Sequence, residues 1–580
     1  MIGNKAKRSK DWKIIQPDLV IEEKFCNQVP ASRIVCRVLL NRGIRTPREA
    51  CEFLNPSMDN LHDPSLLDGI DHAVSRTIKA LDAGEKIMVH GDYDVDGITS
   101  TALLVRVLRA LRADVSWYIP HRQREGYDIR QPGIEEAARR GVNLIITADC
   151  GTSAIDEIEY AKSLGIDVIV TDHHEPGPKI AEPLALINPR KHNCQYPFKD
   201  LAGVGVAFKF AEALVQSLGY DTEAFRRRFV DLVAIGTVAD IVPLVGENRV
   251  LTKCGITEIP RSGKPGIQAL LKIAGIHGKP ITSHMLSYIL CPRLNAAGRL
   301  DDASLALNLL LTKEEAEAEK LAEMLELQNR ERQREQERIT QEAIEQITDR
   351  CLDEKAKVLV LSSQRWHPGI IGIVASKIVD LFHRPAVLIA IDETNNKGVG
   401  SGRSIDSFHL FKALMQCSEL LERCGGHAKA AGLSIMAEKL SDFDEAINEV
   451  ADHVLTQSDL IPQIEVDAEL EIDEITYDLA TELQLLEPFG YGNREPVFAS
   501  RDVKVISKTR LGGNGNHLKL KLATQKTKQI ECVAFGWGES EQLFEIGATV
   551  DLCYNIQINE YAGFKVVQLV LKDAKPSKST

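Results

Sequence analysis

Residues 87–97 read IMVHGDYDVDG, and this stretch decides the expected fold. Its apolar start is typical of a buried parallel strand, and a helical pattern follows its final glycine. Between strand and helix stand Asp92, Asp94 and Asp96, three carboxylates at alternate positions. Carboxylates this close repel one another unless a positive charge lies among them, so a hard divalent cation is the expected neutraliser. The simpler alternative is a capped turn, with one aspartate at the helix N-cap and the others in solvent.

From about residue 80 to 245, short apolar strands alternate with helical stretches, which predicts an α/β fold with a doubly wound parallel sheet. The expected strands are 86–89, 116–119, 143–146 and 167–170. Ligands of such sheets gather at the carboxyl ends of the strands, so the residues that follow each strand are the candidates for chemistry.

Polar clusters follow three of these strands. The first is His90 with the three aspartates, the second is TADCG with Asp149, and the third is TDHHEPGP with Asp172, His173 and His174. Another aspartate, Asp240, lies in the apolar run VAIGTVADIVPL, where an isolated buried carboxylate would be strongly destabilising. Mixed carboxylate and imidazole ligands in this number suit two Mn²⁺ or Mg²⁺ ions that share a bridging carboxylate. Two such ions are suited to phosphoryl hydrolysis.

The composition is that of a globular protein of three or four domains. The chain has 580 residues, of which 44% are hydrophobic and 26% charged, and a net charge of −13. It has no apolar run long enough to span a bilayer and no signal-peptide pattern. Twelve scattered cysteines without a CxxC pair predict free thiols in a reducing cytoplasm.

The rest of the chain divides by pattern. Residues 328–338, QNRERQREQER, contain no apolar residue within a longer helical pattern, which predicts a helix that bridges solvent between two domains. The last segment has five strand patterns, with a short helical piece before the fourth, as in a small oligonucleotide-binding barrel. We expect a helical N-terminal segment packed on the next domain at 1–75, a metal-binding domain at 76–312, a connecting helix at 313–350, a second α/β domain at 351–458 and the barrel at 459–580.

Three glycine-rich or helix-opening segments of the second α/β domain could bind an anion. They are WHPG at 366–369, GSGRS at 400–404 and GGHAKAAG at 425–432. Glycine loops let backbone N–H groups approach an anion, although ordinary turn glycines would look the same. In the barrel, His517, Lys519 and Lys521 alternate and share one strand face. That face could follow a nucleic-acid backbone or could simply be solvated.

These motifs together resemble the RecJ family of the DHH phosphoesterase superfamily. DYDVDG, TADCG, DHH and GTVADIVPL match the metal motifs of that family in order and spacing, and WHPGIIGIVA, SGRS and GGHAKAAG match its DHHA1 domain. The resemblance implies a DHH parallel-sheet domain and a smaller DHHA1 domain joined by a long helix, followed by an OB-type β-barrel. It also implies a single-stranded-DNA-specific 5′→3′ exonuclease that uses Mn²⁺ or Mg²⁺ and releases mononucleotides in recombination and repair.

The resemblance also implies roles for particular residues. The implied metal ligands are His90, Asp92, Asp94, Asp96, Asp149, His173 and Asp240, with Asp149 bridging the ions. The implied catalytic set is Asp94, Asp96, Asp149, His173, His174 and Asp240, with His174 on the scissile phosphate and Asp172 supporting the histidines. The implied substrate-binding residues are Arg299, His367, Arg403, Gly425, Gly426 and His427.

The partner implied by the family is single-stranded DNA, together with single-strand-binding protein and a helicase, and we expect a monomer. Two other functions fit the same residues. One is a phosphodiesterase or pyrophosphatase for small molecules or short oligonucleotides, and the other is a non-catalytic replication scaffold that binds single strands. Residue chemistry alone predicts phosphodiester hydrolysis, whereas the 5′ preference and the choice of DNA come only from the resemblance.

Overall fold

The computed structural model describes residues 10–122, 124–300, 302–523, 528–561 and 563–577. Its contacts divide the chain into two compact units. The parallel-sheet unit comprises residues 44–329 and 484–495, and the barrel unit comprises the chain up to Gly43, residues 330–483 and residues from Pro496 onward. Among the described residues, no helix combines the length and the apolar character needed to cross a membrane.

The parallel-sheet unit is built on five parallel strands in the order β3-β2-β4-β5-β6. Their bounds are β2 Lys86–Gly91, β3 Asp114–Tyr118, β4 Leu144–Ala148, β5 Asp167–Thr171 and β6 Ala185–Ile187. The four strands expected from sequence are confirmed within one or two residues. The three-residue strand β6 was not expected, because so short an apolar run carries no periodicity.

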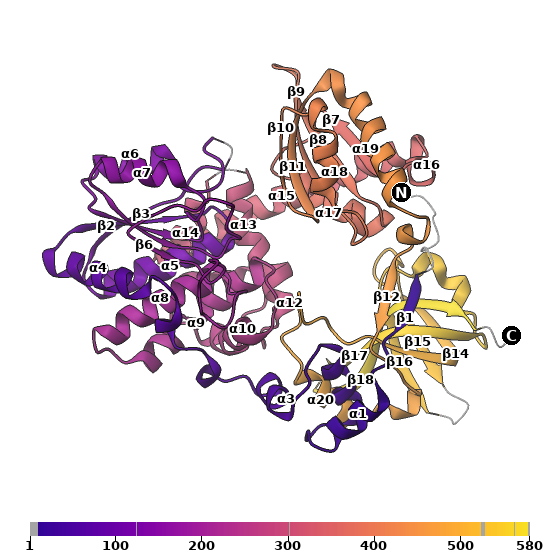
Figure 1. The fold of residues 1–580 in the computed structure, drawn as a ribbon. Coiled ribbons are helices and arrows are strands. Elements are labelled where there is room, and N and C mark those ends of the chain that lie inside the picture. The colour runs from indigo at the N-terminus through magenta and orange to yellow at the C-terminus, as the bar shows by residue number, and fades with distance from the viewer. Residues whose placement is uncertain (1–9, 123, 301, 524–527, 562, 578–580) are drawn as a thin grey trace. The chain divides into compact units, whose positions relative to one another are not determined.

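Helices cover both faces of this sheet (Figure 1). Ile87 and Val89 of β2 join the core on one face, whereas Met88 between them joins the core on the other. A strand buried on both faces reads as a continuous apolar run, as observed here. One face packs on α4 (Ile70–Ala83), α5 (Val95–Ala110) and α8 (Gly203–Ser217), and the other on α6 (Gln131–Arg139) and α7 (Ile155–Ser163). Helix α9 (Thr222–Ala239) packs in turn on α5 and α8.

Further helices complete this unit: α3 Pro47–Leu54, α10 Gly246–Glu258, α11 Pro265–Ile273, α13 Cys291–Leu300 and α14 Ser304–Leu311. The N-terminus of α3 has a capping box between Thr46 and Glu49. Residues 484–495, which we call the strap, return to this unit from the C-terminal part of the chain. The buried guanidinium of Arg249 anchors the strap by donating to three of its backbone carbonyls, those of Leu485, Leu486 and Glu487.

The predicted connecting helix is α15, Glu315–Asp349, a single helix of 35 residues. Its polar middle is not wholly solvated, contrary to the expectation from sequence. Asn329 is 1% exposed and Arg332 is 8% exposed. Nearby, Glu326 is also buried and forms an ion pair of 2.8 Å with Arg293 of α13. The absence of apolar residues therefore reflects buried polar pairing along part of the helix.

The barrel unit contains a five-stranded mixed sheet in the order β10-β11-β9-β8-β7. Its elements are β7 Leu359–Ser363, α17 Ile371–Phe382, β8 Ala386–Asp392, β9 Lys397–Arg403, α18 Leu410–Gln416, β10 Arg423–Gly426, β11 Ala430–Met436 and α19 Leu440–Val454. The GSGRS segment was expected to form a glycine-rich loop, which is wrong, because residues 400–403 lie in β9. A Cβ on Gly402 would come within 2.7 Å of the Leu410 side chain, so close packing explains this glycine.

The C-terminal segment forms the expected five-stranded barrel. Its strands are β14 Phe498–Leu511, β15 His517–Ala523, β16 Gln529–Ala534, β17 Thr549–Tyr561 and β18 Phe564–Pro576. β14 pairs with both β15 and β17, and the order β14-β15-β16-β18-β17 closes the barrel. A short 3₁₀ segment, Gly538–Phe544, precedes the fourth strand as expected. This arrangement is the OB fold.

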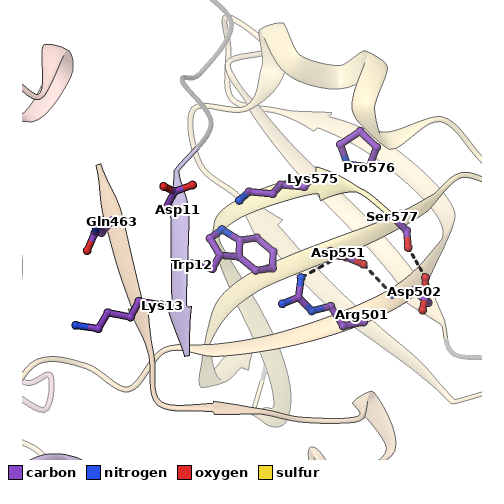
Figure 2. A pocket seen from close by; sticks show the side chains of 10 residues that line it. All are labelled: Asp11, Trp12, Lys13, Gln463, Arg501, Asp502, Asp551, Lys575, Pro576 and Ser577. Atoms are coloured by element: carbon purple, nitrogen blue, oxygen red, sulfur yellow. Dashed lines mark hydrogen bonds and ion pairs between the residues drawn. The ribbon is translucent and has the colours of Figure 1, made fainter. Parts of the chain in front are cut away.

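Residues 10–43 belong to the barrel unit, whereas residues 44–75 belong to the parallel-sheet unit as expected, so the predicted N-terminal segment is divided between the two units. Strand β1, Asp11–Ile14, pairs in parallel with β12, Gln463–Val466. The indole N–H of Trp12 donates to Asp573 at 2.7 Å. Arg501 and Lys575 lie over the Trp12 ring, 5.1 and 5.0 Å from its centroid (Figure 2). These contacts with residues more than 400 positions away hold the strand in place.

Candidate metal centre

The stretch that follows β2 places its aspartates in different roles. Asp94 is the N-cap of α5, and its Oδ1 accepts hydrogen bonds from the N–H groups of Asp96 and Gly97. The N-cap of the capped-turn alternative is thus confirmed, but Asp92 and Asp96 are buried and do not lie in solvent as that alternative required. Asp96 is fully buried, and its two oxygens accept the N–H groups of Gly203 and Val204 at 2.7 and 2.8 Å. The N-terminus of α8 therefore holds a carboxylate that the protein has removed from water.

Asp149, at the end of β4, lies in a strained and crowded position. Its φ of +66° is in the left-handed region, which non-glycine residues seldom adopt. A Cβ on Gly203 would come within 2.4 Å of Asp149 Oδ1, so only glycine fits opposite this carboxylate. Both features fix the direction of the Asp149 side chain.

Asp172 orients the two histidines that follow β5. Its carboxylate accepts the backbone N–H groups of His173 and His174, and it bonds His174 Nδ1 at 2.7 Å. His173 Nε2 then lies 3.1 Å from Asp149 Oδ1 and 3.6 Å from Asp240 Oδ2. Asp240 is the C-cap of α9 and not part of the helix interior.

The predicted ligands come together from four separate segments of the chain. Three overlapping groups have ligand atoms within 4.8 Å of one another: Asp149, His173 and His174; Asp96, His173 and Asp240; and Asp92, Asp94 and Asp149. Among the described residues, His90 is in none of these groups. Its ring stacks on Tyr118, and a Cβ on Gly133 would meet its Nε2 at 2.7 Å.

Several donor atoms of this cluster are buried without a hydrogen-bond partner. Among the described residues they include Asp92 Oδ1, Asp149 Oδ1, both ring nitrogens of His173 and Asp240 Oδ2. A buried polar atom without a partner costs on the order of 1–3 kcal/mol, and a charged one costs more. Carboxylate oxygens and imidazole nitrogens left open in this way are the donor set of divalent cations such as Mn²⁺. The residues therefore fit a metal centre.

The electrostatics of the cluster agree with its geometry. Burial, together with the neighbouring carboxylates, raises the pKa of Asp149 and Asp240 well above the usual range and that of Asp96 to about 7. Burial also lowers the pKa of His173 to about 3, which keeps its imidazole neutral and able to coordinate a metal. Burial opposes the charge of His174, but its hydrogen bond to Asp172 and the negative charges of Asp172, Asp240 and Asp94 together outweigh this effect and raise the pKa to about 9.

The sequence reasoning missed three residues beside the cluster. The Tyr127 hydroxyl lies 2.9 Å from His174 Nδ1, and Asn188 donates to the His174 carbonyl. The Arg122 guanidinium lies 5.3 Å from the centroid of the Tyr93 ring. Tyr127 and Arg122 belong to the segment after β3, so inspecting the end of that strand as well would have found them.

The predicted substrate-binding residues fall into both units. Arg299 lies on α13 of the parallel-sheet unit, where Gly298 packs on the backbone carbonyl of Tyr93. The other five belong to the barrel unit, where Arg403 at the end of β9 pairs in register with Ala430. Residues 427–429, which include His427, form the turn between β10 and β11. The helix that follows His367 lies beside Arg403, because a Cβ on Gly372 would come within 3.2 Å of its guanidinium.

Three family models match parts of the chain. They are described as "DHH family, N-terminal domain" at residues 86–237, "DHHA1 domain" at 355–452 and "RecJ OB domain" at 466–573. The single-stranded-DNA-specific exonuclease RecJ of Bacillus subtilis is 38% identical over 567 residues, which cover 98% of this chain and 71% of that protein. The chain belongs to the RecJ family.

Solved structures of this family agree with the fold. The crystal structure of RecJ from Thermus thermophilus in complex with Mn²⁺ matches with a TM-score of 0.83 and 31% identity. It covers 97% of this chain and 79% of that one. The Mg²⁺ complex of the same protein matches with a TM-score of 0.78 and 30% identity, over 97% and 78% of the two chains. The predicted combination of DHH, DHHA1 and OB domains is confirmed.

The first prediction concerns the protein treated with a chelator. A carboxyl whose pKa is raised by folding binds more protons in the folded state than in the unfolded state. Its contribution to the free energy of unfolding is therefore full below about pH 4, the pKa of an unfolded aspartate. This contribution is lost as the pH rises through about 7, the pKa of folded Asp96. Asp149→Asn removes one of these charges. We expect it to raise the melting temperature at about pH 8.5 by about 1.5 °C, or roughly 1 kcal/mol.

The difference in melting temperature between the variant and the wild type should disappear by about pH 5, because protons then neutralise the wild-type carboxylates. Melting curves across this range measure it, with the exposed Asp156→Asn as the matched control. A wild-type protein as stable as Asp149→Asn at about pH 8.5 would contradict the proposed crowding of charge.

Proposed function

We propose that the protein is a single-stranded-DNA-specific exonuclease that hydrolyses phosphodiester bonds from the 5′ end and releases mononucleotides in recombination and repair. The observation that carries the proposal is the set of buried, unpaired oxygen and nitrogen donors gathered at one edge of the parallel sheet. The relative from Bacillus subtilis is named a single-stranded-DNA-specific exonuclease, which supports the choice of substrate.

The ligands that we assign to two Mn²⁺ or Mg²⁺ ions are Asp92, Asp94, Asp96, Asp149, His173 and Asp240. Asp149 is the proposed bridge because it belongs to two of the three ligand groups and its Oδ1 is buried without a partner. His90, a ligand implied by the family resemblance, is in none of the three ligand groups, and we propose a supporting role for it. When bound, two divalent ions lower the pKa of water and offset charge on the attacking and leaving oxygens of an in-line displacement.

The remaining polar residues of the centre orient the substrate. His174 is fixed by Asp172 and carries a proton at neutral pH, so it can donate to an oxygen of the scissile phosphate. The Tyr127 hydroxyl bonds the same ring, and burial raises the pKa of Tyr127, so the hydroxyl stays protonated. Arg299 is the proposed contact for a substrate phosphate on the parallel-sheet unit.

The barrel unit supplies the other proposed contacts with the strand. His367, Arg403, Gly425, Gly426 and His427 are proposed to bind substrate phosphates. On β15 of the barrel, Leu518, Leu520 and Leu522 are buried, while Lys519 and Lys521 of the opposite face reach solvent. Lys519 pairs with Glu531 at 3.0 Å, so its charge is partly offset. This face is the proposed track for the DNA backbone.

Domain bounds and partners complete the proposal. The metal-binding domain is placed at 76–312, the connecting helix at 313–350, the DHHA1 domain at 351–458 and the OB domain at 459–580, which the ranges of the three family models support. A monomer in the cytoplasm that works with single-strand-binding protein and a helicase fits such an activity.

The second prediction tests the reaction itself. Single strands labelled at either end are incubated with the protein and Mn²⁺. We expect the 5′ label to be released first, as a mononucleotide, and Asp149→Ala to lower the rate at least about 10³-fold, or about 4 kcal/mol of transition-state stabilisation. The exposed Asp156→Ala should keep the wild-type rate. Hydrolysis of dinucleotides alone would favour the small-molecule phosphodiesterase, and binding without cleavage would favour the scaffold.

The third prediction concerns the barrel face. Lys519→Ala with Lys521→Ala should weaken binding to a single strand of about 35 nucleotides roughly tenfold. It should also reduce the slope of log affinity against log salt by about 1.4, since each phosphate contact on a single strand contributes about 0.7. Hydrolysis of a trinucleotide should not change. The matched control removes two exposed lysines of the other unit, Lys79 and Lys162, and an equal loss in both pairs would contradict the assignment.

A further inference from the structure

The loop that connects α9 to α10 has a strained backbone directly after Asp240. Ile241, directly after Asp240, has a φ of +61°, and its side chain is 68% exposed. A β-branched residue in the left-handed region is an outlier, and such strain persists only where the surrounding structure enforces it. Residues further along the loop must therefore hold this backbone in place.

Two hydrogen bonds hold the loop after Ile241. Asn248 Nδ2 donates to the carbonyl of Pro243 at 3.1 Å. The N–H of Leu244 donates to the carbonyl of Tyr491 in the strap at 2.7 Å. Both partners act on the backbone three or four residues beyond Asp240.

The same amide of Asn248 reaches a second segment of the metal centre. Its Nδ2 also donates to the carbonyl of Asp200 at 2.5 Å. Asp200 stands three residues before Gly203, whose N–H binds Asp96. One side-chain amide thus connects the segment that fixes Asp96 with the loop that carries Asp240.

The environment of Asn248 indicates that its role is to donate two hydrogen bonds. The side chain is 0% exposed, and its Oδ1 is buried without a partner. A side chain kept in this place despite an unsatisfied acceptor has a role that an apolar residue cannot fill. Neither alanine nor leucine could donate to the two carbonyls.

The neighbours of Asn248 anchor the first turn of α10 independently of the loop. Glu247 accepts the N–H of His62 and the hydroxyl of Tyr196, and it pairs with Lys209 at 2.9 Å. Arg249 donates to the carbonyl of Phe53 and to the strap. The amide between these two residues is therefore presented from a rigid base.

We infer that Asn248 is a positioning residue of the metal centre, setting the separation of Asp240 and Asp96 through the carbonyls of Pro243 and Asp200. The inference rests on the proposed function, because it assigns Asn248 to the binding of the ions. Asn248 is proposed to contact neither the substrate nor a metal ligand directly and to act through the backbone of two segments.

The test compares Asn248→Ala with Asn555→Ala in the full chain. Asn555, in β17, is also 0% exposed, donates to one backbone carbonyl at 2.6 Å, and has an unpaired Oδ1. Mn²⁺ is titrated into each chelator-treated protein, and free Mn²⁺ is followed by electron paramagnetic resonance. We expect the Kd of at least one ion to rise about 10- to 100-fold in Asn248→Ala and less than about twofold in Asn555→Ala.

Steady-state kinetics on single-stranded DNA give the second readout. For Asn248→Ala, kcat should fall at limiting Mn²⁺ and recover in part with excess Mn²⁺, while KM for DNA stays unchanged. Equal Mn²⁺ affinity in the two variants would overturn the inference and leave the proposed function intact. If the wild type itself bound no Mn²⁺, the proposed function would fail. Should Asn248→Ala not fold, Asn248→Asp keeps the volume but loses both N–H donors, and the same shift in Kd is expected.

Discussion

The repulsion among carboxylates at one edge of the parallel sheet is the constraint on which the rest of the structure depends. Asp96, Asp149 and Asp240 are brought within reach of His173, and burial raises the pKa of each carboxyl. The folded chain tolerates the repulsion among these carboxylates because neighbouring residues hold each of them in place. Glycine at position 203 makes room for Asp149, the start of α8 binds Asp96, and Ile241 keeps a strained backbone beside Asp240. Divalent cations are the charge that offsets it.

The parts of the chain outside the sheet have different physical tasks. The first turn of α10 donates buried hydrogen bonds to backbone carbonyls of the strap and of the loop that follows Asp240, which fixes both segments. The OB barrel alternates buried leucines with lysines that reach solvent along β15, the face proposed above to follow the DNA backbone. The metal cluster and the barrel thus belong to separate units of one chain, and separate family models match them.

Local patterns predicted the sheet, the long helix and the barrel, because apolar periodicity is a property of neighbouring residues. The clustering of the residues that follow β2, β4 and β5 could also be predicted, because the carboxyl ends of parallel strands lie at one edge of the sheet. What sequence could not predict depends on distant partners. Strand β1 has only four residues and is fixed by β12 and Asp573. The GSGRS segment looked like a loop because its glycines make room for the side chains of neighbouring elements. Asn248 carries no signal until the fold places two carbonyls beside it.

The central claim is that the cluster holds two divalent ions between the ends of the strands and α9. Anomalous diffraction from crystals grown with Mn²⁺ measures this most directly. We expect two anomalous peaks within the group formed by Asp96, Asp149, His173 and Asp240, with an Asp149 carboxylate oxygen between them. A single peak, or Mn²⁺ bound only elsewhere on the chain, would contradict it.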